Sequence, residues 1–213
     1  MWLLTAILSL FTTNLIFTRA LGTSTMMAAA KNRSRLPVLA LLMTVFSVFA
    51  CLGMQLICYR AGLAGMLFYP YSLGLPLVYA AVIGVIYLMA LLVSGLLFRK
   101  RPNTYKKYIH LSAFNCAVMG TLYLAFTPEG LTPALSEPPQ TMLFGVLEVS
   151  MDAPFAAILF GLQEGLGFLL AALMLSAVRK RLYDSEVPTA FRGLPAVLVY
   201  IGIISMAVFA VAP

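Results

Sequence analysis

The chain has 213 residues, of which 62% are hydrophobic and only 10% charged, and its mean hydropathy is +0.98. Soluble domains usually carry about 25% charged residues, so the composition excludes an ordinary soluble protein and indicates an integral membrane protein. The formal net charge of +7 does not indicate nucleic-acid binding, because the basic residues lie between apolar stretches, where membrane proteins ordinarily carry them.

Six apolar stretches are long enough to cross a bilayer, which takes about 17–25 residues in a helix. They fall at roughly 2–21, 36–59, 74–98, 108–126, 154–178 and 194–212. We therefore predict an all-α polytopic membrane protein with six transmembrane helices, forming a single domain over residues 1–213. No basic residue precedes the first stretch, so we expect a retained span rather than a cleaved signal.

The basic residues alternate between the predicted connections. The first, third and fifth connections are basic, whereas the second and fourth contain Glu129, Glu137, Arg60 and little other charge. This positive-inside pattern predicts cytoplasmic odd-numbered connections and both termini outside. The basic clusters are Arg19, Lys31, Arg33 and Arg35; Arg99, Lys100, Arg101, Lys106 and Lys107; and Arg179, Lys180, Arg181 and Arg192.

The first and fourth stretches are interrupted by polar residues and glycine. Broken or polar backbone at membrane depth is tolerated where it is buried in protein or lines a cavity. Each interrupted stretch precedes two regular ones, which predicts half-repeats of about 1–98 and 105–213. Three spans per half make this an inverted 3+3 repeat, with its site where the broken segments meet; six unrelated spans are the alternative. The interrupting residues include Asn14, Arg19, Gly22, Ser24, His110, Ser112, Asn115, Cys116 and Gly120.

Three further features bear on packing. Cys51 and Cys58 lie about 10 Å apart along one predicted helix, too far for a disulfide, so we expect them to fill apolar space. Gly161 and Gly165 have the spacing that lets helices approach closely. In the longest connection, 127–153, prolines break the first half, and we expect a short surface helix over 141–151.

Glu164 is the only carboxylate well inside a predicted span. Charges at that depth are costly and are usually partnered or neutralised. Glu164, next to Gln163, is therefore a candidate for an ion pathway; the alternative is a neutral acid that hydrogen-bonds a neighbouring helix. His110 is the sole histidine, so we expect an interfacial role rather than a metal site. No arrangement typical of catalytic residues is present.

Several runs resemble one known family. They are NLIFTRALG (14–22), NCAVMG (115–120), LFGLQEGLGF (159–168) and RKRLYDSEVPTAFRG (179–193), the last with its Val187-Pro188 and Phe191-Arg192-Gly193 elements. Together they are similar to the integral-membrane subunits of Rnf and Nqr complexes, in particular the RnfA/NqrE type, which is related to RnfE/NqrD.

The resemblance implies a role in an ion-translocating electron-transport complex of the bacterial inner membrane. Two homologous subunits of opposite topology would share a 2Fe–2S cluster held by four cysteine thiolates, a ligand set that such clusters prefer. It implies that Cys116 is one ligand and that Asn14, Gly22, Asn115 and Gly120 shape the site. NADH, ferredoxin and flavin would bind other subunits, so this chain would be non-catalytic, supporting electron transfer coupled to Na⁺ or H⁺ movement.

The chain departs from the family pattern at Ser24, where the resemblance places the other cysteine. A hydroxyl is a hard, weak ligand where iron–sulfur chemistry prefers soft thiolate. Three interpretations follow: a cluster held by three cysteines and serine or another ligand, a paralogue that has lost the cofactor, or a deliberately altered protein. The alternative function is a cofactor-free transporter or scaffold on the same fold.

Overall fold

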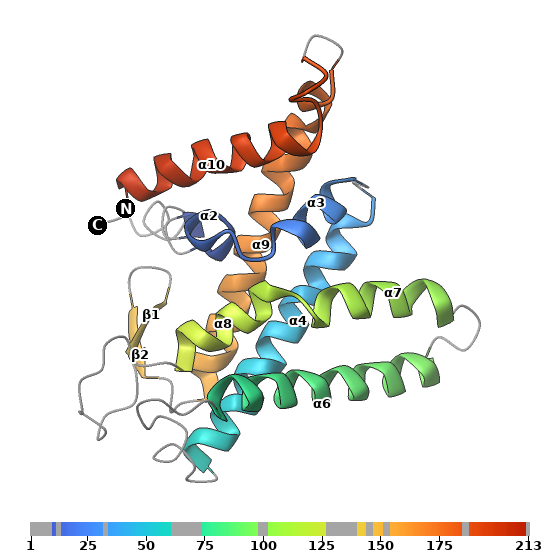
Figure 1. Cartoon of the computed structure of the whole chain (residues 1–213). Coiled ribbons are helices and arrows are strands. Elements are labelled where there is room, and N and C mark those ends of the chain that lie inside the picture. Colours follow the sequence, from blue (N-terminus) through green and yellow to red (C-terminus); the bar gives the residue numbers. More distant parts are fainter. Residues whose placement is uncertain are drawn as a thin grey trace.

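The computed structural model of the chain describes residues 10–11, 14–31, 34–60, 74–97, 102–126, 140–143, 147–150, 154–184 and 188–211 (Figure 1). Half of the first apolar stretch (residues 2–9 and 12–13), together with Glu129 and Glu137, lies outside these residues. The described elements are α2 (Leu15–Arg19), α3 (Thr23–Lys31), α4 (Leu36–Gln55), the π-helical turn η1 (Leu56–Arg60), α6 (Gly74–Leu97), α7 (Pro102–Ala113), α8 (Cys116–Phe126), β1 (Gln140–Leu143), β2 (Leu147–Ser150), α9 (Pro154–Leu182) and α10 (Leu194–Val211).

Three described helices are long and apolar enough to cross a membrane: Leu36–Cys58, Pro76–Leu96 and Pro154–Leu182. They correspond to the predicted second, third and fifth spans, so the prediction of a helical membrane protein is confirmed. A shorter apolar helix, Leu194–Val208, stands at the predicted sixth span. It packs against α2 and α9, and the Ser205 hydroxyl donates to the Phe17 carbonyl of α2.

Helices α4 and α9 run side by side through the centre of the molecule and form its most extensive helix pair (Figure 1). Glycines allow this approach. A Cβ added at Gly161 would lie 2.6 Å from the Cα of Val48, and one added at Gly165 would lie 2.6 Å from the Cβ of Thr44. The predicted close packing at this glycine pair is therefore confirmed.

Both helix interruptions lie where the sequence predicts them. Helices α7 and α8 are separated at Phe114 and Asn115, and α2 and α3 are separated by residues 20–22. In the second case the chain turns through positive φ angles, 56° at Ala20 and 83° at Gly22. Helix α7 pairs with α6, whereas α8 packs on α4 and also contacts α2.

The described chain is helical apart from one antiparallel hairpin, in which Gln140 of β1 pairs with Ser150 of β2. The predicted surface helix over 141–151 is therefore wrong. The β-branched residues Thr141 and Val149, which pair across the two strands, favour extended backbone, and they outweigh the weak helical pattern of this segment.

Cys51 and Cys58 are free thiols, fully buried in α4 and η1. Their burial agrees with the expectation that they fill apolar space between helices.

Candidate functional site

The two helix breaks meet at Cys116. Its Sγ accepts a hydrogen bond of 3.0 Å from the backbone N–H of Gly22, although the two residues are 94 positions apart in the chain. Cys116 is the first residue of α8, and Gly22 directly precedes α3. The start of one broken helix is thus joined to the bend of the other.

Gly22 is required at this bend for two reasons. Its φ of +83° belongs to the left-handed region, which side chains with a Cβ rarely adopt. An added Cβ would also lie 2.9 Å from the Cβ of Ala117. A second glycine acts similarly on α8, because a Cβ at Gly120 would collide with the side chain of Leu21. The two glycines let the broken segments approach within van der Waals contact.

Asn115 holds the start of α8. Its Oδ1 accepts a 3.0 Å hydrogen bond from the N–H of Ala117, and its Nδ2 donates to the Sδ of Met43 on α4 at 3.2 Å. The side chain is buried, with 2% of its surface exposed. A helix start leaves backbone N–H groups without intrahelical partners, and Asn115 satisfies one of them.

Asn14 does the same for α2. Its Oδ1 accepts a 2.9 Å hydrogen bond from the N–H of Ile16, and its Nδ2 donates to the carbonyl of Gly167 on α9 at 2.8 Å. The two asparagines therefore make matching contacts, each with its own broken helix and with one of the two central helices. Asn14 of the first half reaches α9, and Asn115 of the second half reaches α4.

Ser24 lies in the first turn of α3, two positions after Gly22, and its side chain is exposed. Cys116 is exposed as well. The chain itself thus offers one soft sulfur donor at the junction and a hard hydroxyl at the other family position, while Cys51 and Cys58 are buried elsewhere. Within the described ranges, no group of three or more His, Cys, Asp or Glu could hold a metal ion. Cys116 fits a thiolate ligand of a 2Fe–2S cluster, whereas Ser24 offers only a hydroxyl oxygen, which is a hard and weaker ligand.

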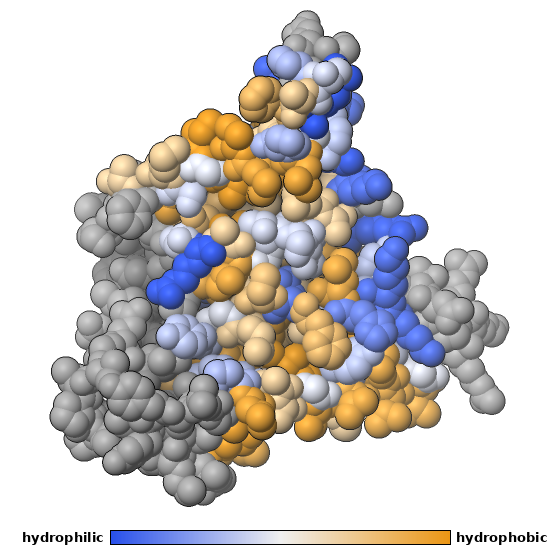
Figure 2. Space-filling model, viewed as in Figure 1, coloured by the Kyte–Doolittle hydropathy of each residue, from blue (hydrophilic) through white to orange (hydrophobic). Residues whose placement is uncertain are grey.

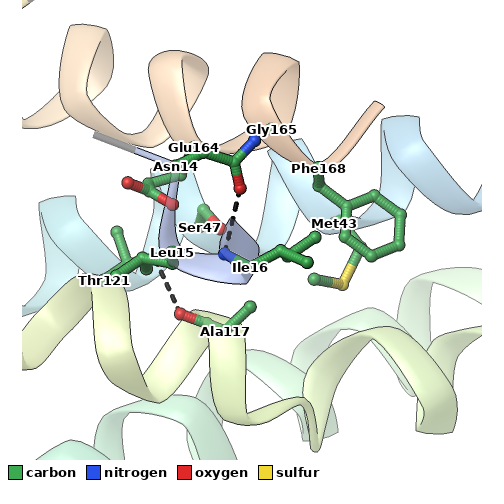
Figure 3. Close-up of a pocket in the computed structure, with 10 residues that line it drawn as sticks. All are labelled: Asn14, Leu15, Ile16, Met43, Ser47, Ala117, Thr121, Glu164, Gly165 and Phe168. Carbon is green, nitrogen blue, oxygen red and sulfur yellow. Dashed lines mark hydrogen bonds between the residues drawn. The ribbon is translucent and has the colours of Figure 1, made fainter. Parts of the chain in front are cut away.

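A small cavity of about 10 Å³ opens beside the junction (Figure 3). Its lining comes from α4, α9, α8 and the start of α2, so both broken helices contribute. The lining residues are Asn14, Leu15, Ile16, Met43, Ser47, Ala117, Thr121, Glu164, Gly165 and Phe168. Asn14, Glu164 and Gly165 can be recognised as candidates from the sequence. Ser47 and Thr121 cannot, because an isolated hydroxyl in an apolar helix carries no local signal.

His110 lies away from this lining, on the exposed side of α7. The hydroxyl of Tyr87 on α6 is 2.8 Å from its Nδ1, and the Tyr87 ring also contacts Phe114 edge-on, with centroids 4.9 Å apart. The structure thus shows a role for His110 in joining α6 to α7. Tyr87 was not singled out from the sequence.

Basic residues of the first and fifth connections contact each other and α7. Arg179 Nη1 donates to the carbonyl of Lys31 at 2.7 Å, and the guanidinium of Arg35 lies 5.7 Å from the ring centroid of Tyr108. Figure 2 shows hydrophilic residues along the right of the view, over the ends of α3, α7 and α9. The last of these connections turns through Gly193, whose φ is +89°.

An apolar bundle in which two broken helices converge on a central helix pair defines a polytopic membrane protein with a candidate site at the convergence. Comparison with known proteins gives the family. The profile of the family described as "Rnf-Nqr subunit, membrane protein" matches residues 2–212, and the chain belongs to this family.

Individual relatives match the chain over only part of its length or at low sequence identity. The chain is 26% identical over 142 residues to an ion-translocating oxidoreductase complex subunit of Psychromonas ingrahamii, an alignment that covers 63% of this chain and 62% of the relative. It is 26% identical over 129 residues to a Na⁺-translocating NADH-quinone reductase subunit of Rhodopirellula baltica, covering 59% and 50%. It is 42% identical over 53 residues to an ion-translocating oxidoreductase complex subunit of Aromatoleum aromaticum, covering 25% and 28%. The chain thus spans less than two thirds of the length of these relatives.

Proposed function

We propose that this chain is a non-catalytic membrane subunit of an Rnf/Nqr-type complex, in which it supports electron transfer across the bilayer coupled to Na⁺ or H⁺ movement. The observation that carries the proposal is the hydrogen bond from Gly22 N–H to Cys116 Sγ, which joins the two broken helices. The family match over 2–212 and the names of the relatives, which are ion-translocating oxidoreductase subunits, support the same role.

The environment of Cys116 suits a cluster ligand. Its Sγ accepts a backbone N–H from Gly22, and N–H···S hydrogen bonds of this kind tune iron–sulfur centres. The sulfur is exposed at the surface of this chain, so donors from a partner protein have access to it. When bound, the cluster would supply one-electron transfer; this chain positions the ligand and limits the space around it.

The partner in this proposal is a homologous subunit of opposite topology, with other Rnf/Nqr subunits beside it. Support comes from the matched contacts of Asn14 and Asn115, which are related as an inverted 3+3 repeat would relate them. Ser24 leaves the donor set one thiolate short. We propose that the cluster is held by three cysteines and an oxygen ligand at or near Ser24.

The orientation also remains a proposal. It is supported by the contacts of Arg179 with Lys31 and of Arg35 with Tyr108, which bring basic residues of the first and fifth connections close to each other and to α7. By the positive-inside rule these connections would be cytoplasmic, and both termini would lie outside the bacterial inner membrane.

The test is to purify the complex with its partner subunits and to measure iron content, visible absorption and electron paramagnetic resonance. Cys116→Ala should abolish the signal of the shared cluster. Cys51→Ala is the matched control, because it removes a thiol that is fully buried within α4 and so is not accessible to a shared cluster, and it should leave the signal intact. Ser24→Cys should strengthen cluster retention by supplying the fourth thiolate.

The opposite result is equally informative. An intact complex in which Cys116→Ala changes neither iron content nor the spectrum contradicts the ligand assignment. An intact complex without a cluster at this junction favours the cofactor-free transporter or scaffold.

A further inference from the structure

Glu164 lies deep within α9. At about 1.5 Å of rise per residue, it is about 15 Å from Pro154 at one end of the helix and about 27 Å from Leu182 at the other. The hydrocarbon core of a bilayer is about 30 Å thick, so this carboxyl group lies at membrane depth. An ionised carboxylate there needs a compensating charge.

Among the described residues that line the cavity next to Glu164, none is Lys, Arg or His and so none supplies this charge. The nearest titratable group on α4 is the buried thiol of Cys51, which cannot become positive. Within the part of the chain that the structure describes, this leaves a bound cation or a proton on the carboxyl group itself as the source of compensation.

The cavity is suited in size and chemistry to a small cation. Its volume of about 10 Å³ is close to the least that accommodates a single water-sized guest, and it excludes organic molecules. Oxygen-bearing side chains enter it from four segments: Asn14 before α2, Ser47 from α4, Thr121 from α8 and Glu164 from α9 (Figure 3). Hard cations prefer such oxygen ligands.

The lone pairs needed for binding are present. The Thr121 hydroxyl donates its proton to the Ala117 carbonyl at 2.8 Å, so the oxygen presents its lone pairs to other partners. Asn14 is held at both ends of its amide by Ile16 and Gly167, and its position is therefore fixed. Ser47 is buried, with 3% of its surface exposed.

We propose that Glu164, Ser47 and Thr121 form a binding site for one dehydrated Na⁺-sized cation at the junction of the two broken helices. The site deepens the proposed function and rests on it, because it places an ion beside the segment that carries Cys116. Ala117, the residue after Cys116, lines the same cavity. A change of charge at the sulfur would thus alter the electrostatic potential at the ion, and a bound ion would alter the potential at the sulfur.

The test is equilibrium binding of ²²Na⁺ to the whole complex in lipid nanodiscs, at a pH where the carboxyl group is ionised. The complex should lose one saturable, Li⁺-competed site when Glu164→Gln is introduced. Ser47→Ala and Thr121→Val should each weaken that site by about tenfold. Ser176→Ala is the matched control, because this hydroxyl on α9 bonds the Leu173 carbonyl at an exposed position, and it should leave Na⁺ binding unchanged.

Two results would overturn the site. One is unchanged ²²Na⁺ binding in all three cavity variants. The other is proton release that depends on Glu164 without any Glu164-dependent Na⁺ binding, which would make the group a proton carrier only. Should Glu164→Gln fail to assemble, Ser47→Ala and Thr121→Val still decide the question.

Iron content measured in the same samples separates this site from the proposed function. Intact iron with Na⁺ binding insensitive to all three cavity variants refutes the cation site alone. Absent iron with Glu164-dependent Na⁺ binding refutes the electron-transfer role and retains the cation site.

Discussion

Asn14 offers the sharpest test of how the broken helices are held, because it makes two separable contacts. Asn14→Ala removes the cap on α2, where the Ile16 N–H donates to Oδ1 at 2.9 Å, and the bond from Nδ2 to the Gly167 carbonyl at 2.8 Å. Losing a helix N-cap costs about 1 kcal/mol. An interhelical hydrogen bond within a membrane protein contributes about 0.6–1.7 kcal/mol. We therefore expect Asn14→Ala to lower the free energy of unfolding by about 2 kcal/mol.

Asn115→Ala is the matched control. It removes an equivalent cap, from the Ala117 N–H at 3.0 Å, but its other contact is only to the sulfur of Met43, a weak acceptor. We expect a loss of about 1 kcal/mol, mostly from the cap. The assay is reversible unfolding in mixed detergent micelles, followed by circular dichroism. If Asn115→Ala proves as destabilising as Asn14→Ala, or more so, the bond to Gly167 does not have the role assigned to it here.

Two further predictions concern glycines. Gly161→Ala should destabilise the chain by about 2 kcal/mol or more, because the new Cβ would lie 2.6 Å from the backbone of Val48. Gly202→Ala is the control: its Cβ would meet nothing within 4 Å, so it should be neutral or stabilising by up to about 1 kcal/mol. Equal losses of stability for the two variants in the same unfolding assay would contradict the close packing of α4 and α9. Gly22→Ala should lower the free energy of unfolding by about 1–2 kcal/mol, because alanine is disfavoured in the left-handed backbone conformation at this position. It should also broaden or abolish the spectroscopic signal that depends on Cys116. An unchanged spectrum and stability would show that the bend does not require glycine.

The sequence predicts the features that have a local signature. Polar residues and glycine inside apolar stretches indicate both interruptions, and the spacing of Gly161 and Gly165 indicates a close helix contact. These signals are local because an unsatisfied backbone group must be capped by a nearby polar side chain, and a close helix contact requires a residue without Cβ. Polar residues and glycines therefore occur at the break or contact itself.

Contacts between distant segments have no such signature. Ser47 and Thr121 read as ordinary residues of apolar helices, and only the packing of α4 against α8 and α9 places them around Glu164. The hairpin was missed for a different reason. Its strands depend on pairing between Gln140–Leu143 and Leu147–Ser150. The sequence pattern of the segment alone favours neither helix nor strand strongly.

Ser24 takes no part in the described contacts that form the junction, and this separates the scaffold from its cofactor. The described contacts that form the junction come from the backbone of Gly22, the sulfur of Cys116 and the side chain of Asn115 with its neighbour Ala117. None of them uses the side chain at position 24, which is exposed. A cysteine or a serine at that position is therefore compatible with the same bend. The contacts of the junction therefore do not depend on the residue at position 24, and the donor set, measured as iron in the assembled complex, decides between electron transfer and a cofactor-free role.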